Sequence, residues 1–182
     1  MKLVVLDRDG VINQDIGEII THPDQWVPID GSLEGIARLT QAGYQIAVAT
    51  NQSGIAREIL TMDQLFRIHQ KMHDLVRQAG GDIDVVVFCP HSDANECDCR
   101  KPAPGLLYDI SERLGIELES IPLVGDSLKD MQAAMAAAMQ PILVKTGTGQ
   151  QTLDDNKGLE HLPAYDDLSS YVDELLVSKV QE

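Results

Sequence analysis

The stretch Leu3-Val4-Val5-Leu6-Asp7-Arg8-Asp9-Gly10, almost at the N-terminus, decides the fold. Its first four residues are apolar, and such a short run bounded by polar residues predicts a strand buried on both faces. Asp7 and Asp9 follow where that strand ends, and Gly10 permits a sharp turn behind them. Buried carboxylates are costly unless a cation or a reaction uses them. We therefore predict that Asp7 is a nucleophile and Asp9 its acid/base partner; an ordinary polar strand end is the alternative.

The rest of the chain alternates apolar runs with segments of helical periodicity, which is typical of a parallel sheet with helices on both faces. The sequence predicts further strands over 44–49, 83–88, 121–124 and 142–144. It predicts helices over 32–41, 61–79, 104–114, 128–138 and 168–177, with Ser32 as the N-cap of the first. We expect an α/β, Rossmann-like fold in one domain spanning 1–182, with a surface loop before the last helix.

The composition limits the partners of this chain. It has 182 residues, 43% of them hydrophobic, and a formal net charge of -15. That charge argues against nucleic acid and against an anionic membrane surface, because both need clustered Lys and Arg. No apolar run is long enough to cross a bilayer and no signal peptide is evident, so we expect a cytoplasmic protein. An anionic substrate needs local cations, and the candidates are Arg57, Arg100, Lys101, Lys129 and Lys145.

Polar residues follow the predicted strands at the edge where a parallel sheet of this kind binds its ligand. Thr50 to Gly54 follows the second strand, and Asp126 and Asp130 follow the fourth. Taken singly, these segments could be a turn cluster and a helix N-cap. Together with Asp7, the converging carboxylates call for a divalent cation, and oxygen ligands favour Mg²⁺. The set suits phosphoryl transfer, in which Lys101 and the Thr50 hydroxyl contact phosphoryl oxygens.

All three cysteines fall close together, at Cys89, Cys97 and Cys99, and His91 lies among them. Two alternatives are a disulfide, which would leave one cysteine unpaired, and inert buried thiols in a loop that looks too polar to bury them. Four soft or borderline ligands instead favour a tetrahedral structural Zn²⁺. We predict a zinc loop over about 89–105 that fixes the direction of the cations immediately after Cys99.

At this point the chain resembles a known family. Asp7-Arg8-Asp9-Gly10, Thr50, Lys101 and Gly125-Asp126 through Asp130 are similar to the four motifs of haloacid-dehalogenase-like (HAD) phosphatases. The resemblance implies that Asp7 is the nucleophile and Asp9 the general acid/base. It implies Mg²⁺ held by the carboxylates of Asp7 and Asp126, with the main-chain carbonyl of Asp9 as a further ligand. No segment is long enough for a large cap domain, so we expect loops to select the substrate.

The zinc-loop sequence and the run Asn51 to Arg57 resemble one branch, the D-glycero-D-manno-heptose 1,7-bisphosphate 7-phosphatases of lipopolysaccharide-precursor (ADP-heptose) synthesis. This resemblance implies a phosphorylated sugar as substrate and removal of its C7 phosphate to give heptose 1-phosphate. Separately, we expect a monomer. The substrate-binding residues it implies are Asp15, Ile16, Gly17, Glu18, Asn51, Gln52, Ser53, Arg57 and Arg100.

Three positions depart from that pattern. Glu58 and Ala138 stand where relatives commonly carry glycine, and Ser127 replaces a lysine found in some members.

Two alternative functions stay open: a histidinol-phosphate phosphatase of the same zinc-containing subgroup, and a zinc-loop binding module without catalysis. A phospho-accepting receiver is excluded, because its acceptor aspartate would end the third strand, which here ends in Phe88-Cys89. We interpret His69 and His73 as a solvated helix face and Trp26 as loop packing.

Overall fold

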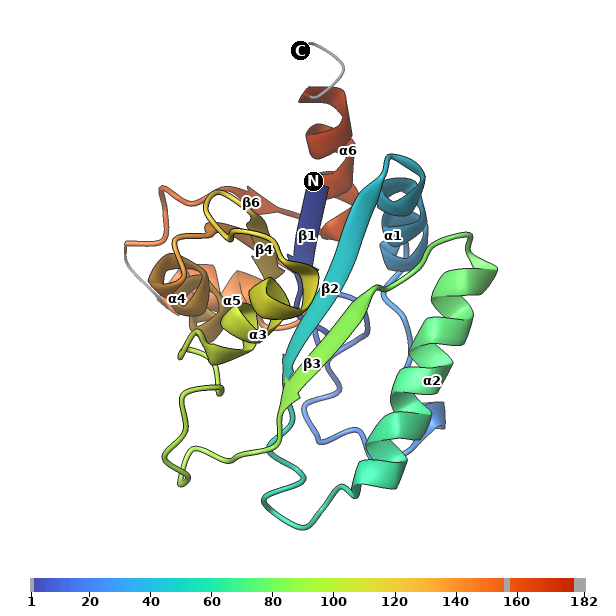
Figure 1. Cartoon of the computed structure of the whole chain (residues 1–182), viewed down its shortest axis with the longest axis vertical. Coiled ribbons are helices and arrows are strands. Elements are labelled where there is room, and N and C mark those ends of the chain that lie inside the picture. Colours follow the sequence, from blue (N-terminus) through green and yellow to red (C-terminus); the bar gives the residue numbers. More distant parts are fainter. Residues whose placement is uncertain (1, 156–157, 179–182) are drawn as a thin grey trace.

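Six parallel strands form a single sheet in the computed structural model, which describes residues 2–155 and 158–178 (Figure 1). The strand order is β3-β2-β1-β4-β5-β6. The bounds are Lys2–Leu6 (β1), Tyr44–Asn51 (β2), Val85–Cys89 (β3), Pro122–Gly125 (β4), Gln140–Val144 (β5) and Ala164–Tyr165 (β6). The predicted parallel sheet is confirmed, and β1 lies at its centre between β2 and β4.

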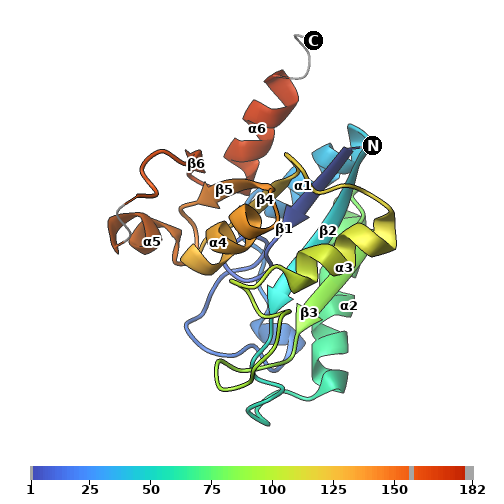
Figure 2. The ribbon, with the colours of Figure 1, turned by 60° about the vertical axis from the view of Figure 1, so that its left-hand side comes forward.

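The central strand separates two hydrophobic clusters. Val4 and Leu6 face one of them and Leu3 and Val5 the other, as the alternation of side chains along a strand requires. The first cluster packs under α1, α2 and α6, and the second under α3 and α4. Figures 1 and 2 show these two groups of helices on opposite faces of the sheet. The carboxyl edge of the strands is thereby left to loops.

The helices begin and end close to the predicted residues. Their bounds are Ser32–Gln41 (α1), Met62–Gln78 (α2), Gly105–Leu114 (α3), Leu128–Ala136 (α4), Gly149–Asp155 (α5) and Leu168–Ser178 (α6), with a short 3-10 helix at Pro23–Gln25 (η1). A capping box opens α2, with the Thr61 hydroxyl accepting from the Gln64 N–H. The prediction of Ser32 as N-cap is wrong. Gly31 takes that position, and the Ser32 hydroxyl donates instead to the Val11 carbonyl over 2.9 Å.

The C-terminal third contains two elements that the sequence did not predict. The expected surface loop holds α5 and the two-residue strand β6, which pairs with β5. A strand this short and a helix that opens with Gly149-Gln150-Gln151-Thr152 carry no readable hydrophobic period. The short β6 extends the sheet by one strand beyond β5.

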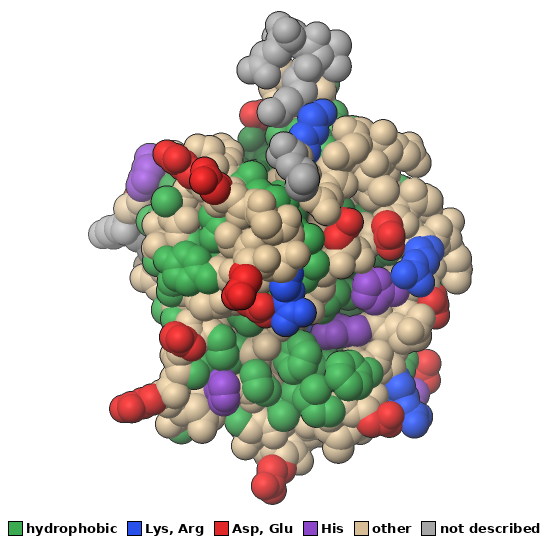
Figure 3. Space-filling view, viewed as in Figure 1, with side chains coloured by type: hydrophobic (Ala, Val, Ile, Leu, Met, Phe, Trp, Pro, Cys, Tyr) green, Lys and Arg blue, Asp and Glu red, His purple; other side chains and the backbone are tan. Residues whose placement is uncertain are grey.

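Acidic side chains are dispersed over the face of the molecule that Figure 3 shows. Hydrophobic side chains gather at the lower centre of that face and on its left side. Trp26, as predicted, is fully buried in the long loop after β1. Within residues 2–155 and 158–178, no helix combines the length and the apolar character that a bilayer span needs.

Within the described part of the chain, three residues other than glycine, Glu58, Ser120 and Ala138, have a positive φ, and the turn at Ala138 shows the consequence most clearly. Ala138 follows α4 with φ +55°, in the left-handed region, and the N–H groups of Ala138 and Met139 donate to the carbonyls of Met135 and Ala134. This is a Schellman ending, in which glycine is the favoured residue at the left-handed position. The departure noted at Ala138 therefore coincides with backbone strain.

We expect Ala138→Gly to raise the free energy of unfolding by about 1 kcal/mol, because a left-handed conformation costs other residues roughly that much. Ala136→Gly is the matched control, since Ala136 is also exposed but is the last residue of α4, before the left-handed position. That control should lower stability by a similar amount. Urea denaturation of both variants measures the difference, and a destabilised Ala138→Gly would contradict the strain argument.

Candidate active site

The central strand and its neighbour deliver carboxylates to one place. Asp7 follows β1 and continues the ladder, since its N–H donates to the Val124 carbonyl of β4 over 2.9 Å. Asp126 follows β4 directly. The chain winds outward from β1 through β2 and β3 and then returns to β4, so β1 and β4 flank the point where the topology reverses. This is where an open α/β sheet binds its ligand.

Three carboxylates and one ammonium group form the centre of the site. Oxygens of Asp7, Asp126 and Asp130 lie within 4.8 Å of one another. Lys101 Nζ, 2% exposed, lies 2.9 Å from Asp7 Oδ1 and 2.6 Å from Asp130 Oδ1, and donates to the Ala49 carbonyl over 2.7 Å. Asp130 is also bound by the N–H and hydroxyl of Ser127, over 3.1 and 2.5 Å. Both oxygens of Asp130 are therefore occupied by these contacts, whereas Asp7 Oδ2 and the oxygens of Asp126 take part in none of them.

Asp126 is enclosed by the loop that follows β5. The Thr148 N–H and hydroxyl both donate to its Oδ2, over 2.8 and 3.1 Å. A Cβ on Gly10 or on Gly147 would overlap that oxygen, and both glycines have positive φ. These positions therefore need glycine for close approach as well as for backbone conformation.

The buried acids resist ionisation. Burial, followed by the nearby Asp130 charge, raises the pKa of Asp126 to about 7. The same two causes raise the pKa of Asp7 well above its ordinary value, although Lys101 opposes them. With all three acids ionised, Lys101 offsets only part of their charge. The donor set is hard, acidic and enclosed, which fits a divalent cation such as Mg²⁺.

The Asp9 side chain turns away from this cluster toward Arg8. Arg8 Nη2 donates to both oxygens of Asp9, over 2.8 and 3.0 Å, while Asn13 and Gln52 donate over 3.0 and 3.1 Å. Burial acts to raise the pKa of Asp9, but the Arg8 charge and these hydrogen bonds outweigh it and lower the pKa. Asp9 is thus held as a carboxylate beside the cluster.

Arg8 is itself supported from α2. Its Nη1 lies 3.2 Å from His69 Nε2, and both side chains are buried. The interpretation of His69 as part of a solvated helix face is wrong. Burial and the Arg8 charge lower the pKa of His69 to about 3, so the neutral ring accepts from the guanidinium.

We expect His69→Gln to reduce the dependence of the free energy of unfolding on pH between pH 7 and 4. The unfolded histidine takes up a proton below about pH 6.5, whereas the folded one does so only near pH 3. The wild type therefore loses stability as pH falls through that window, by at most about 1.4 kcal/mol per pH unit. The substituted glutamine would keep an acceptor for Arg8 without titrating. Denaturation between pH 7 and 4 measures the slope, with His161→Gln as an exposed control. Equal slopes would contradict the assignment.

The last residues of β2 and those directly after it mostly hold other parts of the site in place. Asn51 pairs with the backbone of Lys101, donating to its carbonyl over 3.0 Å and accepting from its N–H over 3.1 Å. Gln52 donates to the Thr50 hydroxyl over 2.9 Å as well as to Asp9. Thr50 and Asn51 border the catalytic cavity described next, whereas Ser53 borders a neighbouring hollow with Gln52.

A cavity of about 230 Å³ opens over the cluster. Its walls contain the candidate catalytic residues together with Arg100, Ser127 and Lys129. Arg100 and Lys129 both donate to Asp93 Oδ1, over 2.8 and 3.2 Å, and lower the pKa of Asp93 to about 2. Of the other candidate cations, Lys145 pairs with Asp166 over 2.9 Å.

A larger hollow of about 680 Å³ adjoins the catalytic cavity, and the two share Asp15. Gly17, Glu18 and Arg57 of the predicted substrate-binding set line it. Ile16 is 40% exposed on the same loop. A phosphate ester bound at Asp7 therefore has room for a polar, sugar-sized remainder beside it.

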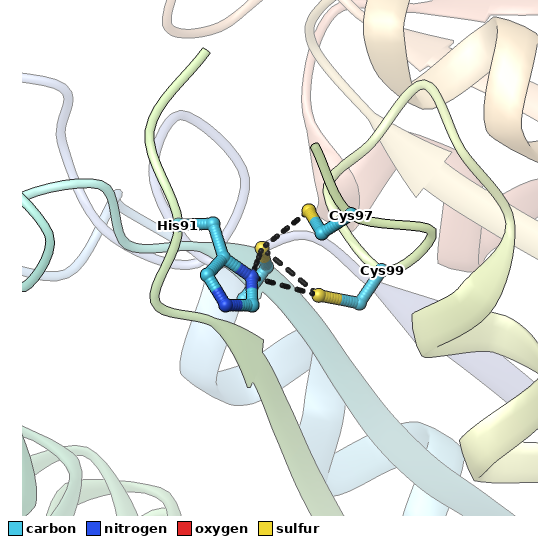
Figure 4. Close-up of side chains that lie close together, drawn as sticks. His91, Cys97 and Cys99 are labelled. Atoms are coloured by element: carbon cyan, nitrogen blue, oxygen red, sulfur yellow. Dashed lines mark hydrogen bonds between the residues drawn. The ribbon is translucent and has the colours of Figure 1, made fainter. Parts of the chain in front are cut away.

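The predicted zinc ligands come together at the end of β3. Figure 4 shows His91, Cys97 and Cys99 converging beside a further thiol, and the four candidate ligand atoms lie within 4.8 Å of one another. Cys89 Sγ lies 3.1 Å from Cys99 Sγ and 3.5 Å from His91 Nδ1. Burial and the neighbouring thiols raise the pKa of Cys99 to about 12. Three sulfurs and an imidazole fit Zn²⁺.

Sequence reasoning missed the supporting residues Arg8, His69 and Thr148. Thr148 follows the fifth strand, so the rule that picked out the other strand ends could have found it. His69 shares a face with Leu65, Ile68, Met72 and Val76, all buried in α2. That spacing is a core stripe, and it outweighs the polar neighbours that suggested exposure.

Comparison with known proteins gives the same class. A family model described as HAD-hydrolase-like matches residues 98–171. Relatives named D-glycero-beta-D-manno-heptose-1,7-bisphosphate 7-phosphatase include one from Neisseria meningitidis serogroup A, 50% identical over 94% of this chain and 95% of its own length. Another, from Pseudomonas aeruginosa, is 49% identical over 96% and 98%.

Solved structures extend the likeness. A D,D-heptose 1,7-bisphosphate phosphatase from B. bronchiseptica, complexed with magnesium and phosphate, matches with a TM-score of 0.93 and 45% identity over 98% of this chain and 99% of that one. The fold and the acid cluster are thus those of a HAD-like phosphatase. Within that class, the chain belongs to the D-glycero-beta-D-manno-heptose-1,7-bisphosphate 7-phosphatase family.

Proposed function

We propose that this protein is a Mg²⁺-dependent phosphatase that removes the C7 phosphate from D-glycero-beta-D-manno-heptose 1,7-bisphosphate and leaves heptose 1-phosphate. The observation that carries this proposal is the buried group of Asp7, Asp126, Asp130 and Lys101 beneath a cavity, in a chain half identical to relatives of that name. The pathway would be lipopolysaccharide-precursor synthesis in the cytoplasm, and 1–182 would form one catalytic domain acting as a monomer.

The reaction begins with attack by a carboxylate oxygen of Asp7 on phosphorus. The bond from phosphorus to the C7 oxygen breaks, and an aspartyl-phosphate forms. The Thr50 hydroxyl and Lys101 Nζ would contact the phosphoryl oxygens, where negative charge accumulates. Both groups border the catalytic cavity. Water then attacks the same phosphorus, which releases inorganic phosphate and restores Asp7.

Asp9 would move the protons. It gives one to the departing C7 oxygen and later takes one from the attacking water. The bonds from Arg8, Asn13 and Gln52 keep it ionised, which suits the second step. The first step needs a protonated Asp9. A bound phosphate dianion favours that form, because negative charge nearby raises the pKa of a carboxyl group.

Two metals complete the proposal. Asp7, Asp126 and the main-chain carbonyl of Asp9 would hold Mg²⁺, whose chemistry here is neutralisation of the acids and of phosphoryl charge. Cys89, His91, Cys97 and Cys99 would hold a structural Zn²⁺. Arg100 and Lys101 follow the last of these ligands, so zinc would fix the backbone from which both cations extend.

The test is phosphate release from the beta and alpha heptose 1,7-bisphosphates and from histidinol phosphate, each with Mg²⁺ or with EDTA. We expect the beta bisphosphate to give the highest kcat/KM, and phosphorus NMR to show heptose 1-phosphate as product. EDTA should stop the reaction. A preference for histidinol phosphate, or release of the C1 phosphate first, would overturn the assignment.

Removal of zinc should affect catalysis before it affects the sheet. We expect a zinc-selective chelator to lower kcat/KM at least tenfold while the far-ultraviolet circular dichroism stays close to native, because the ligands are confined to the last residue of β3 and the loop after it. Metal analysis should find one zinc per chain. A Cys97→Ser variant that retains both zinc and full activity would count against the site.

A further inference from the structure

Two cations meet a single carboxylate oxygen at the edge of the catalytic cavity. Arg100 Nε lies 2.8 Å and Lys129 Nζ 3.2 Å from Asp93 Oδ1. Arg100 comes from the zinc loop and Lys129 from the first turn of α4, and both line the cavity that contains Asp7 and Lys101. Asp93 lies outside that lining. Two separate segments therefore direct positive charge at one anionic oxygen beside the reaction centre.

Stability accounts for little of this arrangement at Lys129. Asp93 is 76% exposed and Lys129 45% exposed, and an ion pair so open to solvent contributes little to folding. Arg100 is 14% exposed, but the carboxylate that it shares with Lys129 is open to solvent. The chain has 14 Lys and Arg residues against 29 acids. Placing two of those cations together at the mouth of the cavity favours a role toward an anionic ligand.

Arg100 already belongs to the expected substrate-binding set. We propose that Lys129 joins it in binding the second, non-reacting phosphate of the bisphosphate, and that Asp93 occupies this place in the free protein. The inference rests on the proposed function. Lys101 is already engaged by Asp7 and Asp130, so it serves the reacting phosphoryl group. Lys129 thereby becomes a specificity-determining residue, and a phosphate dianion displaces a carboxylate of lower charge.

Other side chains near the cavity are less suited than Lys129 to bind a second phosphate. Arg57 lines the larger hollow as one cation beside Asp15 and Glu18, whereas Arg100 and Lys129 converge as two cations on one oxygen. Ser127 is occupied as the N-cap of α4, with its hydroxyl donating to Asp130. Lys129 supplies, two residues further on, the positive charge that Ser127 lacks.

The experiment compares heptose 1,7-bisphosphate with heptose 7-phosphate, which lacks the second phosphate. In Lys129→Gln we expect the ratio of the two kcat/KM values to fall about tenfold, through a higher KM for the bisphosphate. Lys129→Arg should restore the preference. Lys145→Gln is the matched control, because Lys145 is similarly exposed and paired with an exposed aspartate, Asp166. A wild-type ratio in Lys129→Gln overturns the inference.

Asp93→Asn tests the part assigned to the carboxylate. Removal of a competing negative charge should lower the KM for the bisphosphate severalfold and leave the KM for the monophosphate closer to wild type. An unchanged or higher KM for the bisphosphate overturns that part. If the wild type hydrolyses neither sugar phosphate, the proposed function itself fails, and that result is visible before any variant is made.

Discussion

Asp7→Asn should lower kcat by about 10⁴-fold or more, because the amide cannot form the phosphoryl-enzyme. Substrate should still bind, because Thr50 and Lys101 keep their places, as do Arg100 and Lys129 at the edge of the cavity. The variant should also unfold at a higher temperature without metal, because one of three mutually repelling buried carboxylates is gone. Isothermal titration, stopped assays and thermal scans measure the three effects.

The covalent route gives this prediction a direct readout. Rapid quenching of the wild type during turnover should show a peptide containing Asp7 that is heavier by one phosphoryl group, and the variant should not show it. Asp166→Asn is the control, because Asp166 also pairs with a lysine but lies on the surface. It should keep wild-type turnover. Substantial activity in Asp7→Asn would exclude the covalent mechanism.

Among the substitutions described here, Lys101→Met should lower the free energy of unfolding most. The ammonium is 2% exposed and contacts Asp7, Asp130 and the Ala49 carbonyl. Its removal leaves buried carboxylates without that charge, and breaking a buried pair in this way costs about 3–5 kcal/mol. We expect a loss of this size at neutral pH in the absence of metal, together with loss of activity. Urea denaturation measures it.

The pH dependence of that loss has a fixed sign. Asp7 and Asp126 already have raised pKa values, so the folded state binds protons more tightly than the unfolded chain. Stability from such groups is present at low pH and is lost as pH rises through the folded value, which is about 7 for Asp126. Lys101→Met should therefore lose more stability at pH 8 than at pH 5. Mg²⁺ should restore part of it. Lys145→Met should change little, and an equally mild effect of Lys101→Met would contradict the role assigned to this lysine.

Much of the site could be predicted because its residues follow buried strands. The apolar runs mark where β1, β2 and β4 end, and the topology rule then brings Asp7, Thr50 and Asp126 to one edge. The cysteine spacing predicted the Cys/His cluster for a similar reason, because residues so close in sequence lie close in space.

Long-range side-chain pairing was not predictable in this way. Arg8 contacts His69 across 61 residues, and no local pattern in β1 or α2 indicates that pair. Ser32 looked like a helix cap because its type favours that role, yet its hydroxyl is used by the Val11 carbonyl. β6 has only two residues, and its place depends on the exposed edge of β5. In each case a tertiary partner decided the outcome.

The amide of Asn51 holds the main chain of Lys101, fifty positions away, at both its N–H and its carbonyl. A chain that has formed only its first two strands and their helices therefore lacks the ammonium group at its reaction centre. The centre is complete only once the segment that carries Lys101 has docked against the end of β2. We expect a nascent chain that ends before Lys101 to be inert toward phosphate esters.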